Sequence, residues 1–367
     1  MVGIQRIIDK YAGFIIVLIL SFFRFFDKQR TNQRKFLVIK LWAIGDSILT
    51  LSLIKGIRES FKESTIDVLI RTRVKDVYEC YPVDRIYNLD SFPDLLNLLR
   101  MHRHYDVVFD CEPYLNLSAI LAFYLGKERI GFSNQFRSRL YSIKTNFRKD
   151  QHMVRNYLDM LKLLGKQYDV PVLEKLTVPV KDKIKVDDFI SRELQGKTIV
   201  GITPGVAGSS KNRMWFEDRF AELADKIVDL LSCEVVFIDS PGNKETVNKV
   251  ISLMKHQPVN TLGIFTLKET FYLISLCTVY LSNDTGPMHI AASQGCRTVG
   301  LFGPNTPLLW GPYGTGNIAI YKTKLKPAIQ NDKGVFREGN REGYMGGISV
   351  DDVFEAIQEC LGKLSYS

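Results

Sequence analysis

Short apolar runs alternate with amphipathic stretches along most of the chain after position 35. The first series of apolar runs covers residues 36–41, 66–70, 107–111 and 129–132. Stretches with the spacing of an amphipathic helix, such as 47–61 and 95–103, lie between these runs. Buried parallel strands that alternate with helices have this pattern, so we expect a doubly wound α/β sheet.

The same alternation starts again in the second half of the chain. A helical stretch ends at Gly165, and residues 168–188 contain Lys, Asp and Pro without any periodicity. The second series of predicted strands covers 198–203, 234–239, 279–283 and 298–302. Helical spacing occurs between them, at 216–231, 245–254 and 267–276. Two successive α/β sheets predict two Rossmann-like domains that face each other across a cleft.

The pattern divides the chain into four predicted segments. Residues 1–34 form a basic and apolar helix, residues 35–175 the first Rossmann-like domain, and residues 176–350 the second. A last helical pattern at 350–361 marks the segment 351–367, which we expect to pack near the junction of the domains. The predicted fold class is α/β, with two doubly wound parallel sheets and an N-terminal apolar helix.

The N-terminal segment combines an apolar run with a cluster of positive charge. No charged residue lies between positions 11 and 23, and residues 1–40 hold eight basic side chains against two acidic ones. As a helix the run would be about 20 Å long, short of the roughly 30 Å of a bilayer core. We therefore favour a helix that lies at the surface of an anionic membrane. A true span with snorkelling Lys10 and Arg24, and a helix packed on the protein's own surface, are the alternatives.

The composition is that of a globular protein in a reducing compartment. Of the 367 residues, 46% are hydrophobic and 24% are charged. The six cysteines have no CxxC spacing, which argues against a zinc site and a disulfide scaffold. No small-residue cleavage site follows the apolar run, so we do not expect a secretory signal. The net charge of +9 does not predict nucleic-acid binding, because basic and aromatic residues are not interleaved.

The turn after the first predicted strand contains a candidate catalytic carboxylate. Residues 42–47, WAIGDS, lie at the carboxyl end of that strand, where open α/β sheets bind ligands. Gly45 allows a tight turn, and Asp46 would then project toward the ligand. A simple helix cap, formed by Asp46 or Ser47, is the alternative.

The segment 282–292, SNDTGPMHIAA, has the features of an anion-binding helix start. Asp284 or Thr285 would cap the helix, and Pro287 suits its first turn. The free N–H groups and the positive end of the helix dipole favour a bound phosphate. His289 lies one turn after Thr285 on the same face and would flank that phosphate. A capped core helix with an incidental histidine is the alternative.

Two loops that are rich in small residues follow other predicted strands. The loop 203–215 permits close backbone approach to a ligand, and its Lys211 or Arg213 would neutralise phosphate charge. This loop lacks the spacing of a P-loop. The loop 303–314 offers rigid turns and aromatic side chains that suit a sugar or a base. Plain surface loops would have similar sequences.

Several of these segments together resemble glycosyltransferase family 9, the heptosyltransferases. Residues 282–314 are similar to the signature segment of that family, and residues 36–61 to its opening strand, GD turn and first helix. Further similar segments occur in the same order as in the family, at 129–142, 152–165 and 343–357. Phe216 in place of the usual proline, the lack of the cysteines that many members carry near 325–345, and the N-terminal segment are departures.

The resemblance implies a GT-B fold and inverting transfer from a nucleotide-activated sugar, typically an ADP-heptose. It makes Asp46 the general base, and it assigns the acceptor to the first domain and the donor to the second. The residues that it and the loop pattern assign to the donor are Lys211, Arg213, Glu245, Asp284, Thr285, Gly286 and His289. Neither domain contains a DxD-like acidic pair, so we expect no metal ion and no other cofactor.

The acceptor is expected to be anionic and lipid-linked, as in lipopolysaccharide core. The basic side chains that we assign to it are Arg71, Arg73, Arg137 and Arg139. Together with the N-terminal helix they predict a peripheral or anchored protein at the cytoplasmic face of the bacterial inner membrane. One alternative is a transferase of the same fold that uses another nucleotide sugar for capsule or another surface glycan. A catalytically silent nucleotide-sugar binding protein is the other, and Asp46 argues against it.

Overall fold

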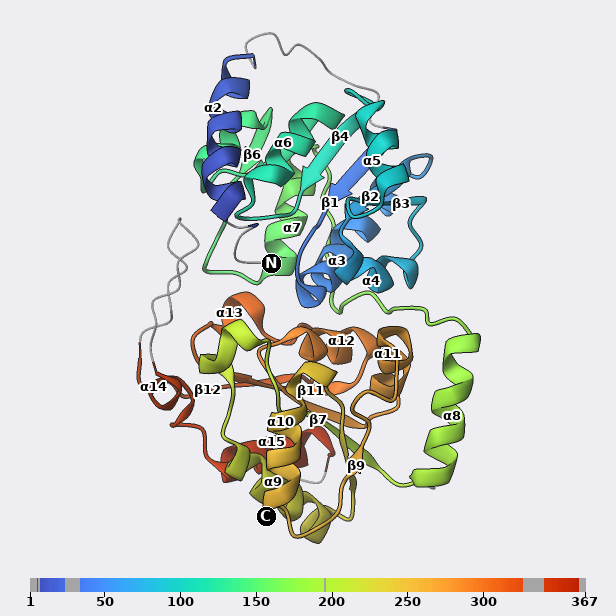
Figure 1. The fold of residues 1–367 in the computed structure, drawn as a ribbon, viewed down its shortest axis with the longest axis vertical. Coiled ribbons are helices and arrows are strands. Elements are labelled where there is room, and N and C mark those ends of the chain that lie inside the picture. Colours follow the sequence, from blue (N-terminus) through green and yellow to red (C-terminus); the bar gives the residue numbers. More distant parts are fainter. Residues whose placement is uncertain (1–4, 6, 24–33, 195, 326–339, 363–367) are drawn as a thin grey trace. The chain divides into compact units, whose positions relative to one another are not determined.

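The computed structural model describes the chain except for residues 1–4, 6, 24–33, 195, 326–339 and 363–367. The described residues form two compact units, unit 1 up to Val170 and unit 2 from Pro171 onward (Figure 1). Each unit contains one six-stranded sheet, and the strand pairs described in both sheets are parallel.

The sheet of unit 1 has the strand order β3-β2-β1-β4-β5-β6. Its strands are β1 (Lys35–Ile39), β2 (Thr65–Ile70), β3 (Arg85–Asn88), β4 (Tyr105–Asp110), β5 (Gly126–Phe132) and β6 (Ile143–Thr145). Its main helices are α3 (Ile44–Ser60), α4 (Lys75–Glu79), α5 (Phe92–Leu99), α6 (Asn116–Leu125) and α7 (Met153–Lys162). The chain order reverses between the central strands β1 and β4. Open α/β sheets bind ligands at the carboxyl ends of the strands at such a switch point.

Unit 2 repeats this plan with the order β12-β11-β10-β7-β8-β9. Its strands are β7 (Ile199–Thr203), β8 (Glu234–Phe237), β9 (Val259–Asn260), β10 (Val279–Asn283), β11 (Arg297–Phe302) and β12 (Ile318–Tyr321). Its helices are α8 (Lys181–Glu193), α9 (Glu217–Leu231), α10 (Lys244–Leu253), α11 (Leu267–Ser275), α12 (Gly286–Gln294), α13 (Pro307–Trp310), α14 (Arg341–Met345) and α15 (Val350–Cys360). The switch point of this sheet lies between β7 and β10.

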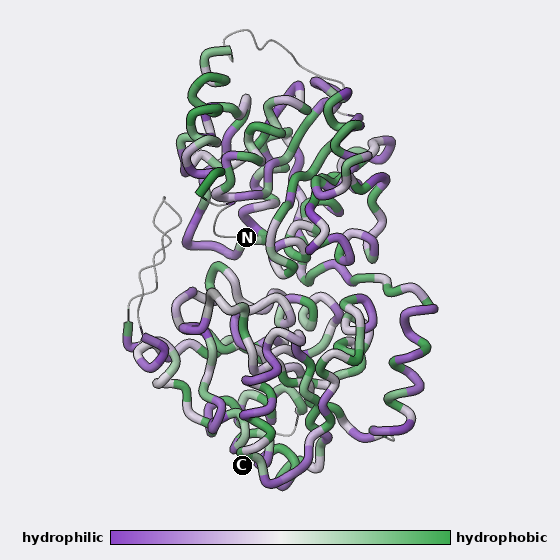
Figure 2. The backbone as a smooth tube through the Cα atoms, in the orientation of Figure 1, coloured by the Kyte–Doolittle hydropathy of each residue, from purple (hydrophilic) through white to green (hydrophobic). Residues whose placement is uncertain are grey.

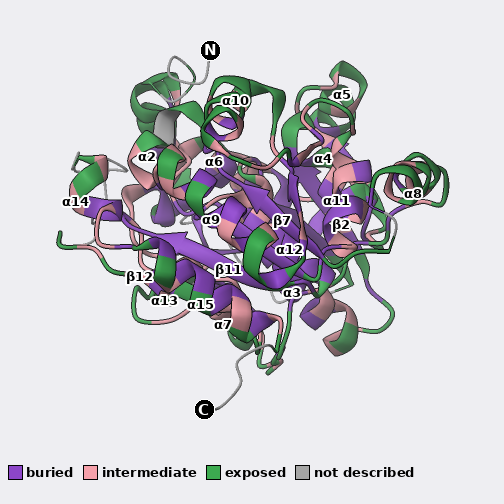
Figure 3. Cartoon of the chain, turned by 90° about the horizontal axis from the view of Figure 1, so that it is seen from below, coloured by how far each residue is buried: buried purple, intermediate pink, exposed green. Residues whose placement is uncertain are grey.

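Burial of the central strands explains why the two apolar series in the sequence become two sheets. All residues of β4, β7 and β10 are buried. Figure 3 shows the strands β7 and β11 as buried and the outer helix α8 as largely exposed. Parallel strands need this cover on both faces, because their apolar side chains point both ways. The predicted fold class of two doubly wound parallel sheets is confirmed.

The edges of both sheets differ from the sequence-based expectation. Neither β3 nor β6 in unit 1, nor β9 nor β12 in unit 2, was predicted. Short edge strands are only half covered, and β6 and β9 contain no fully buried residue, so they lack an apolar run. Helix α8 overlaps the stretch 168–188, for which the sequence predicted no periodic structure. This helix buries Val186 and exposes most of its other residues, so its apolar stripe is narrow (Figure 2).

The last helix, α15, belongs to unit 2. Its buried side chains include Val353, Phe354 and Ile357, which join the core beside β11 and α9. Ser349 caps its first turn, and the Asp352 side chain accepts the Ser349 N–H in return. The structure thus gives the segment after 350 a packing role in the core of unit 2, whereas its predicted place near a domain junction stays a prediction.

The described part of the N-terminal segment packs on unit 1. It consists of a π-helix at Asp9–Gly13, which continues as α2 (Phe14–Phe23). The inward Val17 is fully buried with side chains of α6, and the ring of Phe14 lies 4.7 Å from that of Phe136. The Asp9 carboxylate accepts the backbone N–H groups of Asn116 and Leu117 at the start of α6, at 3.0 and 2.7 Å.

The outward face of this N-terminal segment is apolar and exposed. Its exposed side chains include Ile7, Ile8, Tyr11, Ile15, Ile19, Phe22 and Phe23. Among the described helices none is long and apolar enough to cross a bilayer. The inner face of the described segment fits the alternative of a helix packed on the protein's own surface.

Candidate functional site

A strained turn leads from β1 into α3 at the switch point of unit 1. Ala43 precedes the helix with φ 66° and ψ 116°, a conformation that costs a non-glycine residue of order 1–3 kcal/mol. The Glu112 carboxylate, which follows β4, offsets this cost by accepting the N–H groups of Leu41 and Trp42 at 2.7 and 2.9 Å. Asp46 lies in the first turn of α3, and no side chain caps this helix. The alternative that Asp46 is a helix cap therefore has no support in the geometry.

A buried lysine joins the two carboxylates at this turn. The Nζ atom of Lys40 lies 3.2 Å from Asp46 Oδ2 and 3.3 Å from Glu112 Oε2. The side chain of Lys40 is 1% exposed, whereas that of Asp46 is 25% exposed. Burial lowers the pKa of Lys40, but the neighbouring Glu112 and Asp46 outweigh burial and raise it above the ordinary value. The ammonium is therefore charged near neutral pH. Lys40 and Glu112 were not predicted as site residues from the sequence, although both stand at the ends of predicted central strands.

Two of the predicted acceptor residues lie beside the same turn. The guanidinium groups of Arg71 and Arg73 each lie 5.3 Å from the centre of the Trp42 ring. Arg71 also pairs with Asp90 at 2.6 Å, which holds its side chain in place. The Trp42 ring thus brings two cations next to the turn that carries Asp46.

The other two predicted acceptor residues have different surroundings. Arg139 is exposed, with its guanidinium 4.4 Å from the centre of the Phe136 ring. Arg137 is fully buried and donates to Asp110, at 2.9 Å, and to the carbonyl of Leu115. Burial raises the pKa of Asp110 in spite of this ion pair. Arg137 offers no surface to an acceptor, so the prediction for this residue is corrected: it supports the segment after β4 from inside.

The predicted anion site of unit 2 lies at the start of α12, directly after the central strand β10. Thr285 occupies the N-cap position, but no side chain caps the helix, and Pro287 lies in its first turn. The Thr285 hydroxyl lies 3.0 Å from that of Ser282. The first N–H groups of a helix have no partner within the helix. The uncapped start of α12 at Gly286 can therefore bind an anion.

A charge pair connects this helix start with the loop after β7. Arg213 Nη1 lies 3.3 Å from Asp284 Oδ2, and the Asn305 amide donates to the same oxygen at 2.6 Å. Burial raises the pKa of Asp284, although Arg213 acts in the opposite direction. Lys211, in the same loop, is exposed. The structure therefore brings Arg213, Asp284 and the start of α12 together, with Asn305 from the loop after β11 as a residue that the sequence analysis did not single out.

His289 faces the interior of unit 2. It is 4% exposed, and its Nδ1 atom has no hydrogen-bond partner among the described residues. Burial lowers its pKa to about 4. The imidazole is therefore neutral at neutral pH, and it can contribute a hydrogen bond to a ligand but no positive charge.

The remaining predicted donor residue, Glu245, is exposed in the first turn of α10, after β8. Two positions after β8 lies the half-buried carboxylate of Asp239, which accepts the Gly205 N–H at 2.7 Å and an N–H of the Asn243 amide at 2.6 Å. Burial raises the pKa of Asp239. Asp239 thus holds the loop after β7 against the turn before α10. A carboxylate directly after a buried strand was the signal that would have found it.

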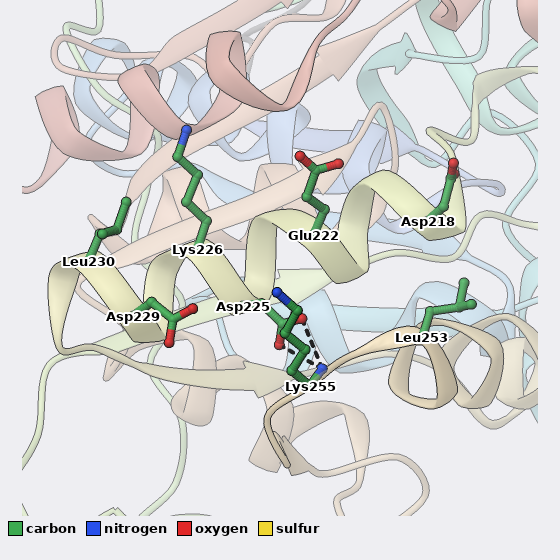
Figure 4. A pocket seen from close by; sticks show the side chains of 8 residues that line it. All are labelled: Asp218, Glu222, Asp225, Lys226, Asp229, Leu230, Leu253 and Lys255. Atoms are coloured by element: carbon green, nitrogen blue, oxygen red, sulfur yellow. Dashed lines mark hydrogen bonds between the residues drawn. The ribbon is translucent and has the colours of Figure 1, made fainter.

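A groove on unit 2 lies apart from these residues. Figure 4 shows it between α9 and the turn after α10, where the Asp225 carboxylate accepts the Lys255 N–H at 2.9 Å. The residues that line it are Asp218, Glu222, Asp225, Lys226, Asp229, Leu230, Leu253 and Lys255. None of them belongs to a predicted site. Among the described residues no group of three His, Cys, Asp or Glu side chains is placed to hold a metal ion.

Comparison with known proteins identifies one family. The sequence model of glycosyltransferase family 9 (heptosyltransferase) matches residues 98–335. A lipopolysaccharide core heptosyltransferase of Haemophilus influenzae is 24% identical over 286 residues, which are 75% of this chain and 81% of the relative.

Solved structures show the same fold. A family 9 glycosyltransferase from Veillonella parvula has a TM-score of 0.76 at 23% identity, covering 92% of this chain and 100% of its own. The ADP-heptose lipopolysaccharide heptosyltransferase II of E. coli has a TM-score of 0.71 at 21% identity, covering 90% of this chain and 99% of its own. The family match covers well over half of the chain and includes the loop after β7 and all of α12. The chain therefore belongs to glycosyltransferase family 9, the heptosyltransferases, and is a glycosyltransferase with the GT-B fold.

Proposed function

We propose that this enzyme transfers a heptose, with inversion, from an ADP-activated donor to an anionic, lipid-linked glycan such as lipopolysaccharide core. The observation that carries the proposal is the carboxylate of Asp46 at the switch point of one sheet and the uncapped start of α12 at that of the other. Both arrangements occur in a member of a family whose relatives are named for transfer to lipopolysaccharide. The domain at 35–175 would bind the acceptor, and the domain at 176–350 the donor.

The donor diphosphate would bind at the start of α12. The helix dipole favours an anion there by about 0.3–1 kcal/mol, and more in a partly buried site. Thr285 and His289 would add hydrogen bonds, and Arg213 with Lys211 would add positive charge. The exposed Glu245 would contact the nucleoside, as the family resemblance implies.

Asp46 would act as the general base. The acceptor hydroxyl loses its proton to the Asp46 carboxylate while its oxygen forms a bond to the anomeric carbon of the donor. The bond from that carbon to the diphosphate breaks, and the nucleoside diphosphate leaves with the electron pair. The positive groups at the start of α12 would stabilise this leaving anion.

The acceptor and the membrane would be bound by unit 1. Arg71 and Arg73, whose guanidinium groups lie over the Trp42 ring, would contact phosphates or acidic sugars of the acceptor near Asp46. The exposed Arg139 is a further contact. The apolar outer face of the N-terminal helices would lie in the cytoplasmic surface of the inner membrane, as a peripheral attachment.

A transfer assay with the variant Asp46→Asn tests the proposal. The variant keeps the shape of the side chain but cannot accept the proton, so we expect kcat to fall by roughly 10²–10⁴-fold. Calorimetry should show unchanged ADP binding, and wild-type enzyme should bind ADP more tightly than UDP or GDP. Near-normal turnover by the variant would return Asp46 to a structural role. A preference for UDP would overturn the ADP-heptose assignment but not the family.

A further inference from the structure

Asp46 is held by a buried group of charges rather than by solvent. Its Oδ2 atom accepts a hydrogen bond from the Lys40 ammonium at 3.2 Å. Among the described residues its Oδ1 atom has no hydrogen-bond partner. A quarter of the side chain is exposed. One oxygen is thus fixed from inside, and the other remains for a hydroxyl group of a substrate.

The titratable groups around Asp46 come from several strands and helices of unit 1. Lys40 follows β1, and Glu112 follows β4. The other titratable groups near this cluster are Tyr78 of α4, Tyr157 of α7 and Cys111 beside β4, and burial raises the pKa of all three. These three groups are neutral near neutral pH. The charge-bearing groups of the cluster are therefore the Lys40 ammonium and the carboxyl groups of Asp46 and Glu112.

The second carboxylate changes what the lysine does. A lone ammonium beside Asp46 would stabilise the ionised form and weaken it as a base. Glu112 shares the ammonium at 3.3 Å, and its other oxygen is held by the N–H groups of Leu41 and Trp42. Its charge offsets that of Lys40. Lys40 thus holds Asp46 in one orientation while it also pairs with Glu112.

We propose that Lys40 and Glu112 are positioning residues that orient the Asp46 carboxylate and set the pH range in which it works as the base. The inference rests on the proposed function of Asp46 and assigns roles to two residues that the donor and acceptor contacts do not include. Neither residue needs to touch the substrate, because Lys40 is 1% and Glu112 5% exposed.

The variant Lys40→Met tests the first role in the full-length enzyme, with kcat and KM measured against pH. Without the ammonium, two carboxylates share a buried site, and one of them holds a proton more tightly. We expect kcat to fall at least tenfold at neutral pH, the acid limb of the kcat profile to move up by about one pH unit or more, and the donor KM to change little. Lys35→Met, an exposed lysine at the other end of β1, is the matched control and should change neither quantity.

The variant Glu112→Gln provides a second test, which holds even if Lys40→Met folds poorly. The glutamine oxygen can still accept the N–H groups of Leu41 and Trp42, and the ammonium keeps its pair with Asp46. The acid limb should now move to lower pH, opposite to the effect of Lys40→Met, and the double variant should lie between the two. Limbs that stay in place in the folded variants, even with lower melting temperatures, would show a structural role only and overturn the proposal. An active Asp46→Asn variant would instead overturn the proposed base itself.

Discussion

Burial decides the chemistry of several single residues whose type alone predicted a role in binding. Arg137 is a cation by type, but the structure closes it inside unit 1 against Asp110. His289 is a potential cation by type, but burial keeps it neutral down to a pH of about 4. Both residues show that a side chain's surroundings, rather than its spacing in the sequence, determine whether it can meet a ligand as a charge.

The neutral His289 predicts a loss of stability in acid. The pKa of His289 is about 4 in the folded protein, and an unfolded histidine has a pKa of about 6.5. Between these values the unfolded chain binds more protons, so the free energy of unfolding falls as the pH is lowered from about 6.5 to 4. By this linkage the titration of His289 lowers the free energy of unfolding by about 2 kcal/mol between pH 7 and pH 5.

Urea unfolding of the variant His289→Asn measures this contribution. The variant should lose about 2 kcal/mol less than the wild type between pH 7 and pH 5, because asparagine does not titrate. His102→Asn removes an exposed histidine of unit 1 and serves as the control, with an acid loss like that of the wild type. An equal acid loss in His289→Asn and the wild type would contradict the neutral, buried state of His289.

The roles that we propose for two helices depend on different features of their surface. Helix α12 presents an uncapped start next to Arg213 and Asp284, so its role depends on backbone groups at one end. Helix α2 has apolar side chains on both sides. Its proposed membrane role depends on the side that stays exposed after the other side packs on unit 1. Val17 is buried on unit 1, whereas Ile15 and Ile19, on the opposite side, are 57% and 53% exposed. An amphipathic helix at a membrane surface has this division.

Vesicle binding tests the outer face of α2. The combined variant Ile15→Gln, Ile19→Gln and Phe22→Gln should stay in the supernatant with anionic vesicles, whereas the wild type should pellet. Transfer of such side chains out of water contributes about 1.5–3 kcal/mol each when it is complete, so we expect at least a tenfold loss of affinity. The melting temperature should change little, because Val17 and Asp9 still hold the segment on unit 1.

Ile184→Gln is the control for this experiment. Ile184 lies on α8 and is 57% exposed, like Ile15, but it belongs to a mostly polar helix. Its variant should pellet with the vesicles like the wild type. Equal pelleting of the α2 variant and the wild type would remove the membrane role of this helix.

At the scale of the whole molecule, the two sheets repeat one plan but carry different chemistry at their switch points. Unit 1 brings together the proposed base Asp46 and cations that we assign to an acceptor, whereas unit 2 brings together a helix start and Arg213. A ligand that binds a folded unit stabilises it by RT ln(1 + [L]/Kd), about 2.7 kcal/mol at a hundredfold excess over Kd. The two units should therefore respond differently to ADP.

Hydrogen exchange with ADP at a hundredfold excess over its Kd measures this response. Protection should appear in peptides from 203–215 and from the start of α12, by about two orders of magnitude where exchange follows unfolding of unit 2. The double variant Thr285→Ala and Arg213→Ala should lose most of this protection without a large change in the melting temperature of the unliganded protein. Protection confined to unit 1 would contradict the assignment of the donor to unit 2.

The sequence by itself determined the central strands, the two successive sheets and the family. Central strands such as β4 and β10 are buried on both faces, so their apolar runs are long enough to recognise from composition alone. The segment 282–292 was recognisable for a related reason. A strand end, Pro287 and a helix pattern follow one another within a few residues, so their geometry is local.

Only the tertiary structure decided which distant residues meet. Lys40 and Glu112 are 72 positions apart and Arg213 and Asp284 are 71 apart, and each pair comes together because central parallel strands end at the same edge of a sheet. The same packing buried Arg137 and left the edge strands β6 and β9 without an apolar signal. Local sequence patterns report what a segment prefers to form, whereas contacts, burial and charge at a site depend on which segments the fold places beside one another.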